Sequence, residues 1–520
     1  AGAEIRGEKA EGIFEKRYGY DPVTGNSAMP VPKDPGNGEG FKYSDLVSYA
    51  NAMDQLSGQE IEENRFASFY GALDYSLFDR YVLNVSFRTD GSNNFGSDEQ
   101  FNPTWSAGAV WHVSEETFME VVRPVLSRLS LRVATGYTGN INKTVKPNLM
   151  MKYYKNFRIS DDENYRMGYI NNAPNPKLRW EKTRDVKVAL DFGLWKDRIN
   201  GIVEAYWRKS KDCVTSEYVP VTTGFFNQSY NTSVLQNNGV EFSLSVAVLK
   251  SKDYNLSVSA NVAWNQNKLK KYNSPNTSLA LDKYVGYPMG AVFSGKYEGI
   301  DPETGMYKFK LRPDAVTNKD GYLREPNNYY YYLGTSVAPF TGGFNLNFSY
   351  KNIGLSVGGS YSVKAKMVDN IESPAGYELL SGSKLESIPT PHNDLYRNHL
   401  NVKREVRNRW TPENRTGVKY PRLIDAYGKK LGLDLTNPTL TTITRGALLE
   451  DISYLRINTI ALSYSLPQRV LERINFSSAA LNLTLNNFFT ITKYSGIDPE
   501  VPGATYPVSR SVTIGLNVGF

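Results

Sequence analysis

Cysteine is nearly absent from this sequence. Cys213 is the only one among 520 residues, so no disulfide can form within the chain. Histidine is also scarce, with three residues scattered at His112, His392 and His399. Cysteine and histidine supply most zinc ligands and many nucleophile–base pairs. The sequence therefore predicts no zinc site, no Cys/His nucleophile pair and no cofactor.

Long apolar runs are missing as well. No window approaches the roughly 18 consecutive apolar residues that a membrane-spanning helix needs, and the mean hydropathy is −0.46. This excludes helical spans but not membrane-spanning β-strands, half of whose residues face a polar lumen. The charge balance is ordinary, with 60 Lys and Arg against 53 Asp and Glu and no long basic run. Nucleic acid is therefore not an expected partner.

Aromatic residues and alternating segments are abundant. The 36 Tyr and 23 Phe favour strands over helical bundles. Residues 183–194 illustrate the pattern, because apolar and polar side chains alternate with a period of two. One face carries Val186, Val188, Leu190 and Phe192. The other carries Lys187, Ala189 and Asp191. The final residues, 511–520, repeat the pattern and end on Phe520, an ending typical of outer-membrane barrels. We expect the apolar face to contact lipid.

The connections between the expected strands alternate in length. About 13 strands of roughly ten residues run from 65–75 to 511–520, long enough to cross a bilayer when tilted. Short turns alternate with long links, the longest of which are 139–182, 210–236, 266–339 and 365–449. A β-sandwich has no reason to alternate in this way, whereas outer-membrane barrels have short periplasmic turns and long extracellular loops. We therefore predict an all-β, transmembrane antiparallel β-barrel.

The strand count also predicts how the chain is divided. Residues 1–64 are polar and turn-rich, and we expect them to form an extracellular loop region. Residues 65–520 then form the C-terminal part of the barrel. Single-chain bacterial barrels have an even number of strands. Thirteen strands, the first of which begins on the extracellular side, therefore imply that the N-terminal strands of the barrel are missing from this sequence. The start at Ala1, without an initiator Met or a signal peptide, fits processing or truncation.

Many short motifs, in one order, resemble the SusC/RagA family of TonB-dependent outer-membrane transporters. The most specific are YLRIN at 454–458 with LP at 466–467, and NNFFTITKYSGIDPE at 486–500. The others lie at 64–69, 88–92, 111–116, 136–140, 175–183, 238–242, 299–305, 340–344 and 409–414. The resemblance covers about residues 64 to 520.

The resemblance implies a barrel of about 22 strands, an N-terminal plug and a TonB-contacting segment, of which the last two have no counterpart in this sequence. It also implies several partners: a SusD-like surface lipoprotein, the N-terminal part of the same transporter, the TonB complex through that part, and outer-membrane lipid. The implied function is import of oligosaccharides, or alternatively peptides. No bond is made or broken in such import, so no enzyme is expected.

One run of residues is a candidate ligand site. It comprises Asn327, Asn328, Tyr329, Tyr330, Tyr331 and Tyr332, late in the 266–339 loop. Aromatic faces stack on sugar rings or peptide side chains, while amides hydrogen-bond polar ligands. The alternative is an aromatic band at the membrane interface. The sequence alone leaves both open.

Acidic stretches are weaker candidates. Those at 301–305 and 498–500 could be calcium loops, but Asp-Pro sequences of this kind favour tight turns. The cluster at 161–163 reads as a solvated loop rather than a cation or partner site. No pair of carboxylates is singled out for glycoside hydrolysis. The alternative functions are a passive or adhesive surface barrel and an outer-membrane enzyme.

Overall fold

The structure of the chain is a computed structural model. It describes residues 1–15, 24, 57–142, 145–155, 166–225, 227–272, 284–303, 305, 307–314, 329–368, 407–420, 445–502 and 506–520.

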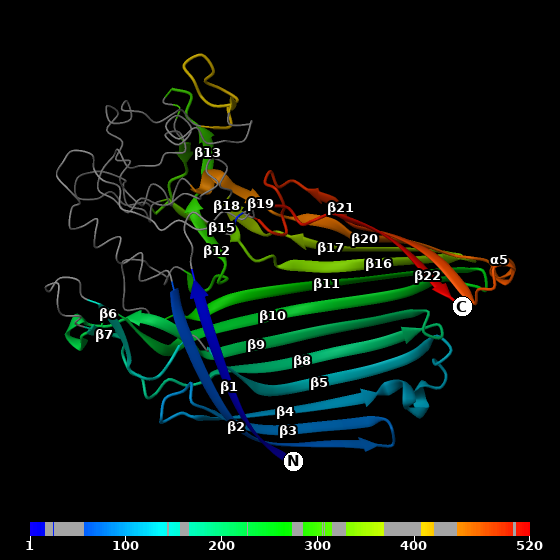
Figure 1. The fold of residues 1–520 in the computed structure, drawn as a ribbon, viewed down its shortest axis with the longest axis horizontal. Helices are drawn as coiled ribbons and strands as arrows, with labels where there is room; N and C mark the ends of the chain where they lie inside the picture. Colours follow the sequence, from blue (N-terminus) through cyan, green and yellow to red (C-terminus); the bar gives the residue numbers. More distant parts are fainter. Residues whose placement is uncertain are drawn as a thin grey trace.

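One antiparallel sheet dominates the described residues (Figure 1). It has 14 strands, and each is hydrogen-bonded to the next in chain order, skipping the strands of the long loops. The strands are β1 (Gly2–Glu15), β2 (Ser57–Leu77), β3 (Tyr81–Ser92), β4 (Phe101–His112), β5 (Leu126–Asn140), β8 (Glu181–Leu194), β9 (Ile199–Tyr218), β10 (Asn227–Lys250), β11 (Tyr254–Lys271), β16 (Phe340–Tyr350), β17 (Ile353–Val363), β20 (Tyr454–Ser465), β21 (Ser478–Thr492) and β22 (Ser511–Gly519).

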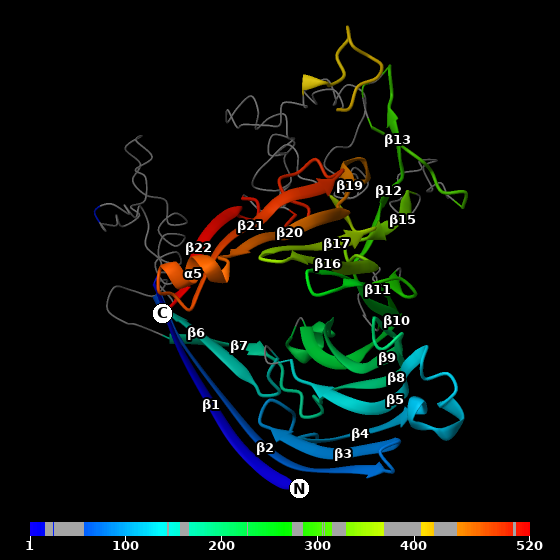
Figure 2. The same ribbon diagram turned by 90° about the vertical axis from the view of Figure 1, so that its right-hand side faces the viewer.

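The sheet bends into a trough whose open side lies between β1 and β22 (Figure 2). Among the described residues, no pairing joins these two edge strands. The register between β8 and β9 places apolar residues of the two strands opposite each other on the same face of the sheet. Val188 lies opposite Ala205, and Leu190 lies opposite Val203. The convex face is apolar yet exposed, as Leu73 at 63% illustrates. An apolar face of this size is normally in contact with another molecule. In this fold that molecule is membrane lipid.

The two ends of the sheet differ in their connections. One end has short turns, in which Phe78, Asp79 and the run 195–197 adopt positive φ. It also carries α5 (Gln468–Arg473) and the short 3-10 helices η1 (Val113–Glu115) and η2 (Thr117–Met119).

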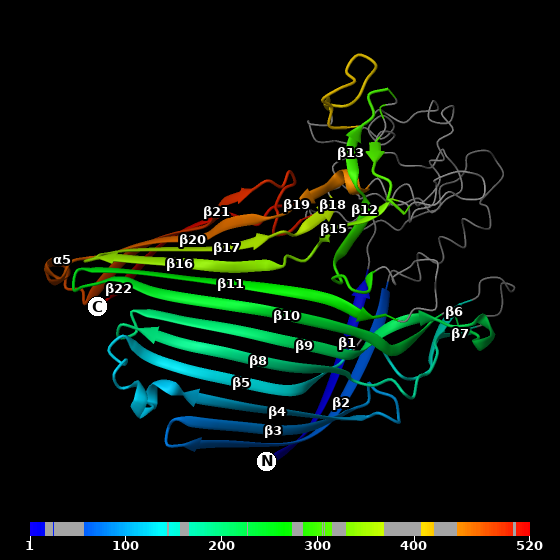
Figure 3. The ribbon, with the colours of Figure 1, turned by 180° about the vertical axis from the view of Figure 1, so that it is seen from behind.

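The other end carries the long loops and their own small sheets, as the reverse view makes clear (Figure 3). These two-stranded sheets pair β6 (Met150–Lys155) with β7 (Arg166–Asn172), β12 (Ala291–Gly295) with β15 (Tyr330–Thr335), β13 (Tyr297–Ile300) with β14 (Tyr307–Phe309), and β18 (Lys366–Val368) with β19 (Leu449–Asp451). The 3-10 helices η3 (Val221–Thr223) and η9 (Arg445–Leu448) complete this end.

No helix in the described part of the chain is long and apolar enough to cross a membrane.

The expectation of a loop over residues 1–64 is wrong for 2–15 and 57–64. These segments form β1 and the first part of β2, paired from Gly2 opposite Tyr70 to Glu15 opposite Ser57. β2 ends at Leu77, on the side of the short turns, and Gly2 pairs with Tyr70. Ala1 therefore lies beside the sheet near the short turns rather than in an outer loop. The count is therefore 14 rather than 13, and the argument from an odd count fails.

Sequence periodicity missed β1 because this strand lacks an apolar face. Charged side chains occupy both of its faces, and ion pairs form along each one. The two pairs are Arg6–Glu8 at 3.2 Å and Lys9–Glu11 at 2.6 Å. Backbone hydrogen bonds to β2 hold the strand in place instead of burial. The loop expected over 210–236 is also mostly strand, since β9 and β10 extend through it as a long hairpin.

Candidate functional site

The concave face of the sheet is charged on one side of the trough. Three ion pairs cross-link β5, β8 and β9: Arg132–Asp191 at 2.7 Å, Lys187–Glu204 at 3.3 Å and Arg208–Asp185 at 2.8 Å. Each sits at a position that alternates with the lipid-facing residues. Each of these charged side chains therefore has its counter-charge on the neighbouring strand.

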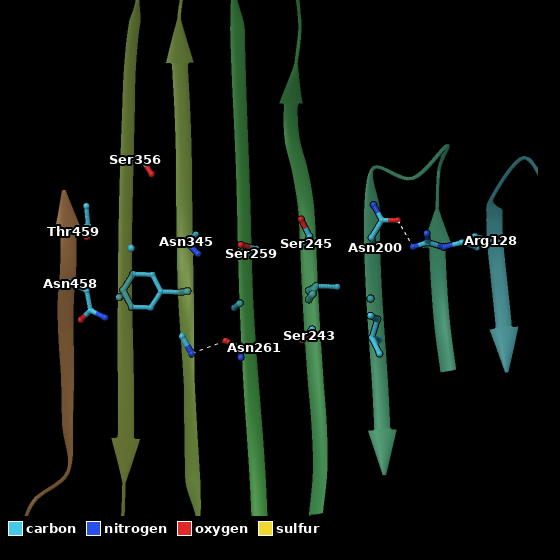
Figure 4. Close-up of a pocket in the computed structure, with 18 residues that line it drawn as sticks. Arg128, Asn200, Ser243, Ser245, Ser259, Asn261, Asn345, Ser356, Asn458 and Thr459 are labelled. Carbon is cyan, nitrogen blue, oxygen red and sulfur yellow. Dashed lines mark hydrogen bonds between the residues drawn. The ribbon is translucent and has the colours of Figure 1, made fainter. Parts of the chain in front are cut away.

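The other side of the concave face is uncharged. Strands β16, β17, β21 and β22 contain no Asp, Glu, Lys or Arg, and β20 contains only Arg456. A hollow of about 740 Å³ extends from this surface across β11 and β10 to Asn200 in β9 and Arg128 in β5, and Arg128 is its one charged lining residue. Figure 4 shows Ser and Asn side chains reaching it from successive strands: Asn200, Ser243, Ser245, Ser259, Asn261, Asn345, Ser356 and Asn458. This lining can donate and accept hydrogen bonds but offers almost no charge.

Two of the longest outer loops are joined to each other. The indole Nε1 of Trp410 donates a hydrogen bond of 2.9 Å to the Pro302 carbonyl oxygen. Trp410 is 6% exposed. Gly446 in η9 meets the Gly295 carbonyl in β12 so closely that a Cβ at Gly446 would lie 1.8 Å from that oxygen. The loops 266–339 and 365–449 therefore form one assembly, which we call the outer assembly.

An aromatic cluster lies in this assembly. It comprises Tyr284, Tyr287, Phe293 and Tyr332. The rings of Tyr287 and Tyr332 are 4.9 Å apart, and Tyr287 meets Phe293 edge-on at 4.9 Å. Partial burial, with a contribution from Tyr287, raises the pKa of Tyr332 above its ordinary value. Tyr332 is nevertheless 41% exposed, so part of its ring remains open to a ligand or partner.

The candidate tyrosines lie close to this cluster. Tyr329 and Tyr330 are half-buried at the start of β15, and the Tyr331 hydroxyl donates to the Leu311 carbonyl at 2.8 Å. Because β15 pairs with β12 at the loop end, these residues are not part of the main sheet's lipid-facing strands. Asn327 and Asn328 lie outside the described residues. The ligand role of all six residues stays a prediction.

A second outer feature is a strap, residues 175–180, that links three outer loops. Its backbone accepts a hydrogen bond from Gly96, and Trp180 stacks on Phe95 at 4.5 Å. On its other side, Arg179 pairs with Asp212 at 2.7 Å and Asn231 accepts from the Arg179 backbone at 3.0 Å. The strap therefore connects the loop after β3 with the outer ends of β9 and β10.

The acidic stretches form turns. Asp301 accepts hydrogen bonds from the backbone of Glu303 and Gly305, and Gly305 has φ +70. The Asp498 carboxylate binds Arg456, at 2.5 Å, and backbone N–H groups. The turn interpretation is confirmed at both places. Within the described ranges no group of three His, Cys, Asp or Glu could hold a metal ion. Residues 161–163 lie outside these ranges.

Sequence reasoning missed three members of the aromatic cluster. Tyr284, Tyr287 and Phe293 lie in a Gly- and aromatic-rich stretch, 284–293, that could have attracted notice. Their meeting with Tyr332, however, depends on the pairing of β12 with β15 across more than thirty intervening residues. No local pattern predicts that pairing.

The strand length, the exposed apolar convex face, the polar concave face and the contrast between short turns and long loops define an outer-membrane β-barrel. The family model described as "TonB dependent receptor-like, beta-barrel" matches residues 14–380. The chain belongs to this family. Receptors of this kind are not enzymes, in agreement with the expectation from sequence.

Named relatives agree with the expected resemblance to SusC and RagA. The TonB-dependent receptor SusC of Bacteroides thetaiotaomicron is 27% identical over 488 residues, covering 88% of this chain and 44% of SusC. TonB-dependent receptor P26 of Formosa agariphila is 26% identical over 498 residues, covering 88% and 46%. The RagAB peptide transporter structure superposes with a TM-score of 0.71 at 25% identity, covering 90% of this chain and 49% of that one. The chain spans about half the length of the relatives it matches.

Proposed function

We propose that this chain is the C-terminal barrel part of a TonB-dependent importer that takes up oligosaccharides, or alternatively peptides, across the outer membrane. The outer assembly carries the proposal. Its aromatic cluster offers partly exposed rings at the loop end of a trough whose inner face is polar. Aromatic rings suit sugar or peptide side-chain contacts, while polar walls suit a hydrated solute.

The partners belong to the same proposal. A SusD-like surface lipoprotein would cover the outer assembly, where Met289 and Val337 are 58% and 62% exposed. The rest of the transporter would pair with the edges of β1 and β22 and carry the plug and the TonB contact. The similarity to the RagAB peptide transporter supports the peptide alternative.

The test is solute uptake by cells that express the full-length transporter with its lipoprotein. Labelled neutral oligosaccharides and mixed tetrapeptides would be offered to matched strains with and without functional TonB. We expect TonB-dependent accumulation of one class. Binding without accumulation would favour the adhesive alternative, and accumulation independent of TonB would favour a passive barrel.

A further inference from the structure

We propose that the uncharged inner wall, formed by β11, β16, β17, β20 and β21, is the side of the lumen along which the imported solute moves, and that this solute is neutral and rich in hydroxyl or amide groups. The inference rests on the proposed function of import. It adds where the path runs and what chemistry the path accepts.

Three hollows follow one another along this wall. The outer one, about 510 Å³, is lined by Asn486, Asn487 and the loop residues 500–501 and 508–509. The middle one, about 740 Å³, shares Asn458 and Thr459 with it. The inner one, about 430 Å³, shares Ser356 with the middle hollow and reaches residues next to the short turns. Shared lining residues place the three hollows next to one another along these strands, and we call this row of hollows the track.

The wall strands offer hydrogen bonds but no counter-charge to this track; the one charged side chain that lines the middle hollow, Arg128, comes from β5 and donates a hydrogen bond to Asn200 at 3.0 Å. Ser243, Ser245 and Asn345 are exposed and Ser259 is partly exposed, and all four line the middle hollow. Hydroxyls and amides both donate and accept, so they can replace the water around a neutral polar solute. A charged solute would lose hydration here without an opposite charge to compensate, which is costly. The one acid in the outer hollow, Glu500, is already paired with Arg456 at 3.1 Å.

The opposite side of the trough is less suited to passage. Its charged side chains are tied into cross-strand pairs, such as Lys187–Glu204 and Arg132–Asp191. A solute moving there would have to compete with these pairs for each contact. The wall from β11 to β21 lacks such cross-links, apart from neutral hydrogen bonds such as Ser356 to Asn347 at 2.8 Å. The distribution of charge therefore favours one side.

The test measures how readily single cysteines react in the full-length transporter. Cys213 and any cysteine outside this chain are replaced by serine. Ser259→Cys and Asn345→Cys probe the wall. Ser106→Cys in β4 and Asn84→Cys in β3 are matched controls away from the wall, with the same original residues and the same inward face. Asn345, Ser106 and Asn84 are exposed, and Ser259 is partly exposed. The probe is a neutral polyethylene glycol maleimide added outside intact cells, with the proton gradient intact or collapsed.

We expect the gradient to raise the labelling rate severalfold at positions 259 and 345 and to leave positions 84 and 106 unchanged. A rise confined to 84 and 106, or equal at all four, would overturn the inference. If no position responds while TonB-dependent uptake persists, the inference is wrong and the proposed function stands. If no position responds and TonB-dependent uptake is also absent, both the inference and the proposed function are wrong.

A second reagent tests the solute chemistry. An anionic sulfonated maleimide, normalised to its reaction with free cysteine, should label positions 259 and 345 severalfold more slowly than the neutral probe. Equal or faster labelling by the anionic reagent would overturn the assignment of a neutral solute. Each cysteine variant must also give the heat-modifiable barrel band of the parent, which separates misfolding from altered access.

Discussion

The Arg456 guanidinium donates to the Asp498 carboxylate at 2.5 Å, and the two side chains are 3% and 6% exposed. Arg456 lies in β20, whereas Asp498 lies in the loop after β21. The carboxylate also accepts backbone hydrogen bonds from Glu500 at 2.9 Å and Val508 at 3.1 Å. One buried acid therefore holds the described residues around Glu500 and Val508, in the loop after β21, against the sheet. It also joins the two motifs that most resemble SusC and RagA.

The first prediction concerns this ion pair. Asp498→Asn leaves a buried guanidinium with only the partly exposed Glu500 as counter-charge, and breaking a buried pair costs about 3 kcal/mol or more. Urea unfolding of the full-length transporter, followed by loss of the heat-modifiable band, would measure the change. Asp314→Asn is the control, because the Arg312–Asp314 pair at 2.7 Å is exposed and should matter little. Equal effects of the two substitutions would contradict the assigned role.

The same carboxylate predicts a pH dependence. Burial alone would raise the pKa of Asp498, but the bonds from Arg456 and from the two backbone N–H groups outweigh it and lower the pKa. An unfolded Asp has a pKa of about 3.9. The contribution to stability is therefore fully present above about pH 4 and is lost as the pH falls through the lowered folded value. Asp498→Asn should flatten the acid limb of the stability curve, and an unchanged limb would argue against this group.

The third prediction tests which face meets lipid. Val258 and Ser259 are neighbours on β11 that point to opposite faces of the sheet. Val258→Arg should cost about 2–4 kcal/mol if it lies near the midplane, while Ser259→Arg should be much milder because it enters the lumen. The pair Val188 and Ala189 is less clean, since Ala189 is only 4% exposed beneath its charged neighbours. Equal costs in a folding titration would refute the face assignment.

The fourth prediction concerns the outer assembly. Trp410→Ala removes the indole that binds the Pro302 carbonyl and should loosen the loops 266–339 and 365–449 together. Trypsin should then cleave both loops faster in the folded transporter. Trp195→Ala, at an exposed short turn, should leave these cleavage rates unchanged. If only the loop that carries Trp410 became sensitive, the two loops would not be coupled.

The fifth prediction concerns the candidate ligand residues. Tyr330→Ala with Tyr331→Ala should weaken solute binding without lowering the barrel yield, and Tyr332→Ala should weaken it further by opening the aromatic cluster. Calorimetry with the solute identified by the uptake test would give the affinities. Tyr254→Ala, which removes a ring stacked on Tyr350 at 5.0 Å beside a short turn, is the control. Unchanged affinity in every tyrosine variant would remove these residues from the site.

Sequence periodicity predicted the strands that separate an apolar face from a polar one. Residues 183–194 and 340–350 illustrate this, because burial of one face imposes a period of two that is visible without the fold. β20 departs from this regular period where its register against β21 shifts between Ile457 and Thr459. β1 escaped detection because a strand held by backbone pairing and ion pairs carries no such period.

The site was less accessible to sequence reasoning than the fold. The tyrosine run drew attention through its composition, and Tyr332 does lie among aromatic rings. Its partners in the cluster, the Trp410 contact with Pro302 and the track of linked hollows all depend on distant segments meeting. Such meetings are set by strand pairing and loop packing, which leave no local signature.

The last strand of the described sheet carries a risk of mispairing before the barrel is complete. β22 presents Val512, Ile514 and Leu516 at 56%, 73% and 66% exposure and contains no charge. An uncharged edge strand of this kind can pair with any free strand through its unpaired backbone groups. β22 therefore needs a chaperone or an insertion machine until a neighbouring strand covers its edge.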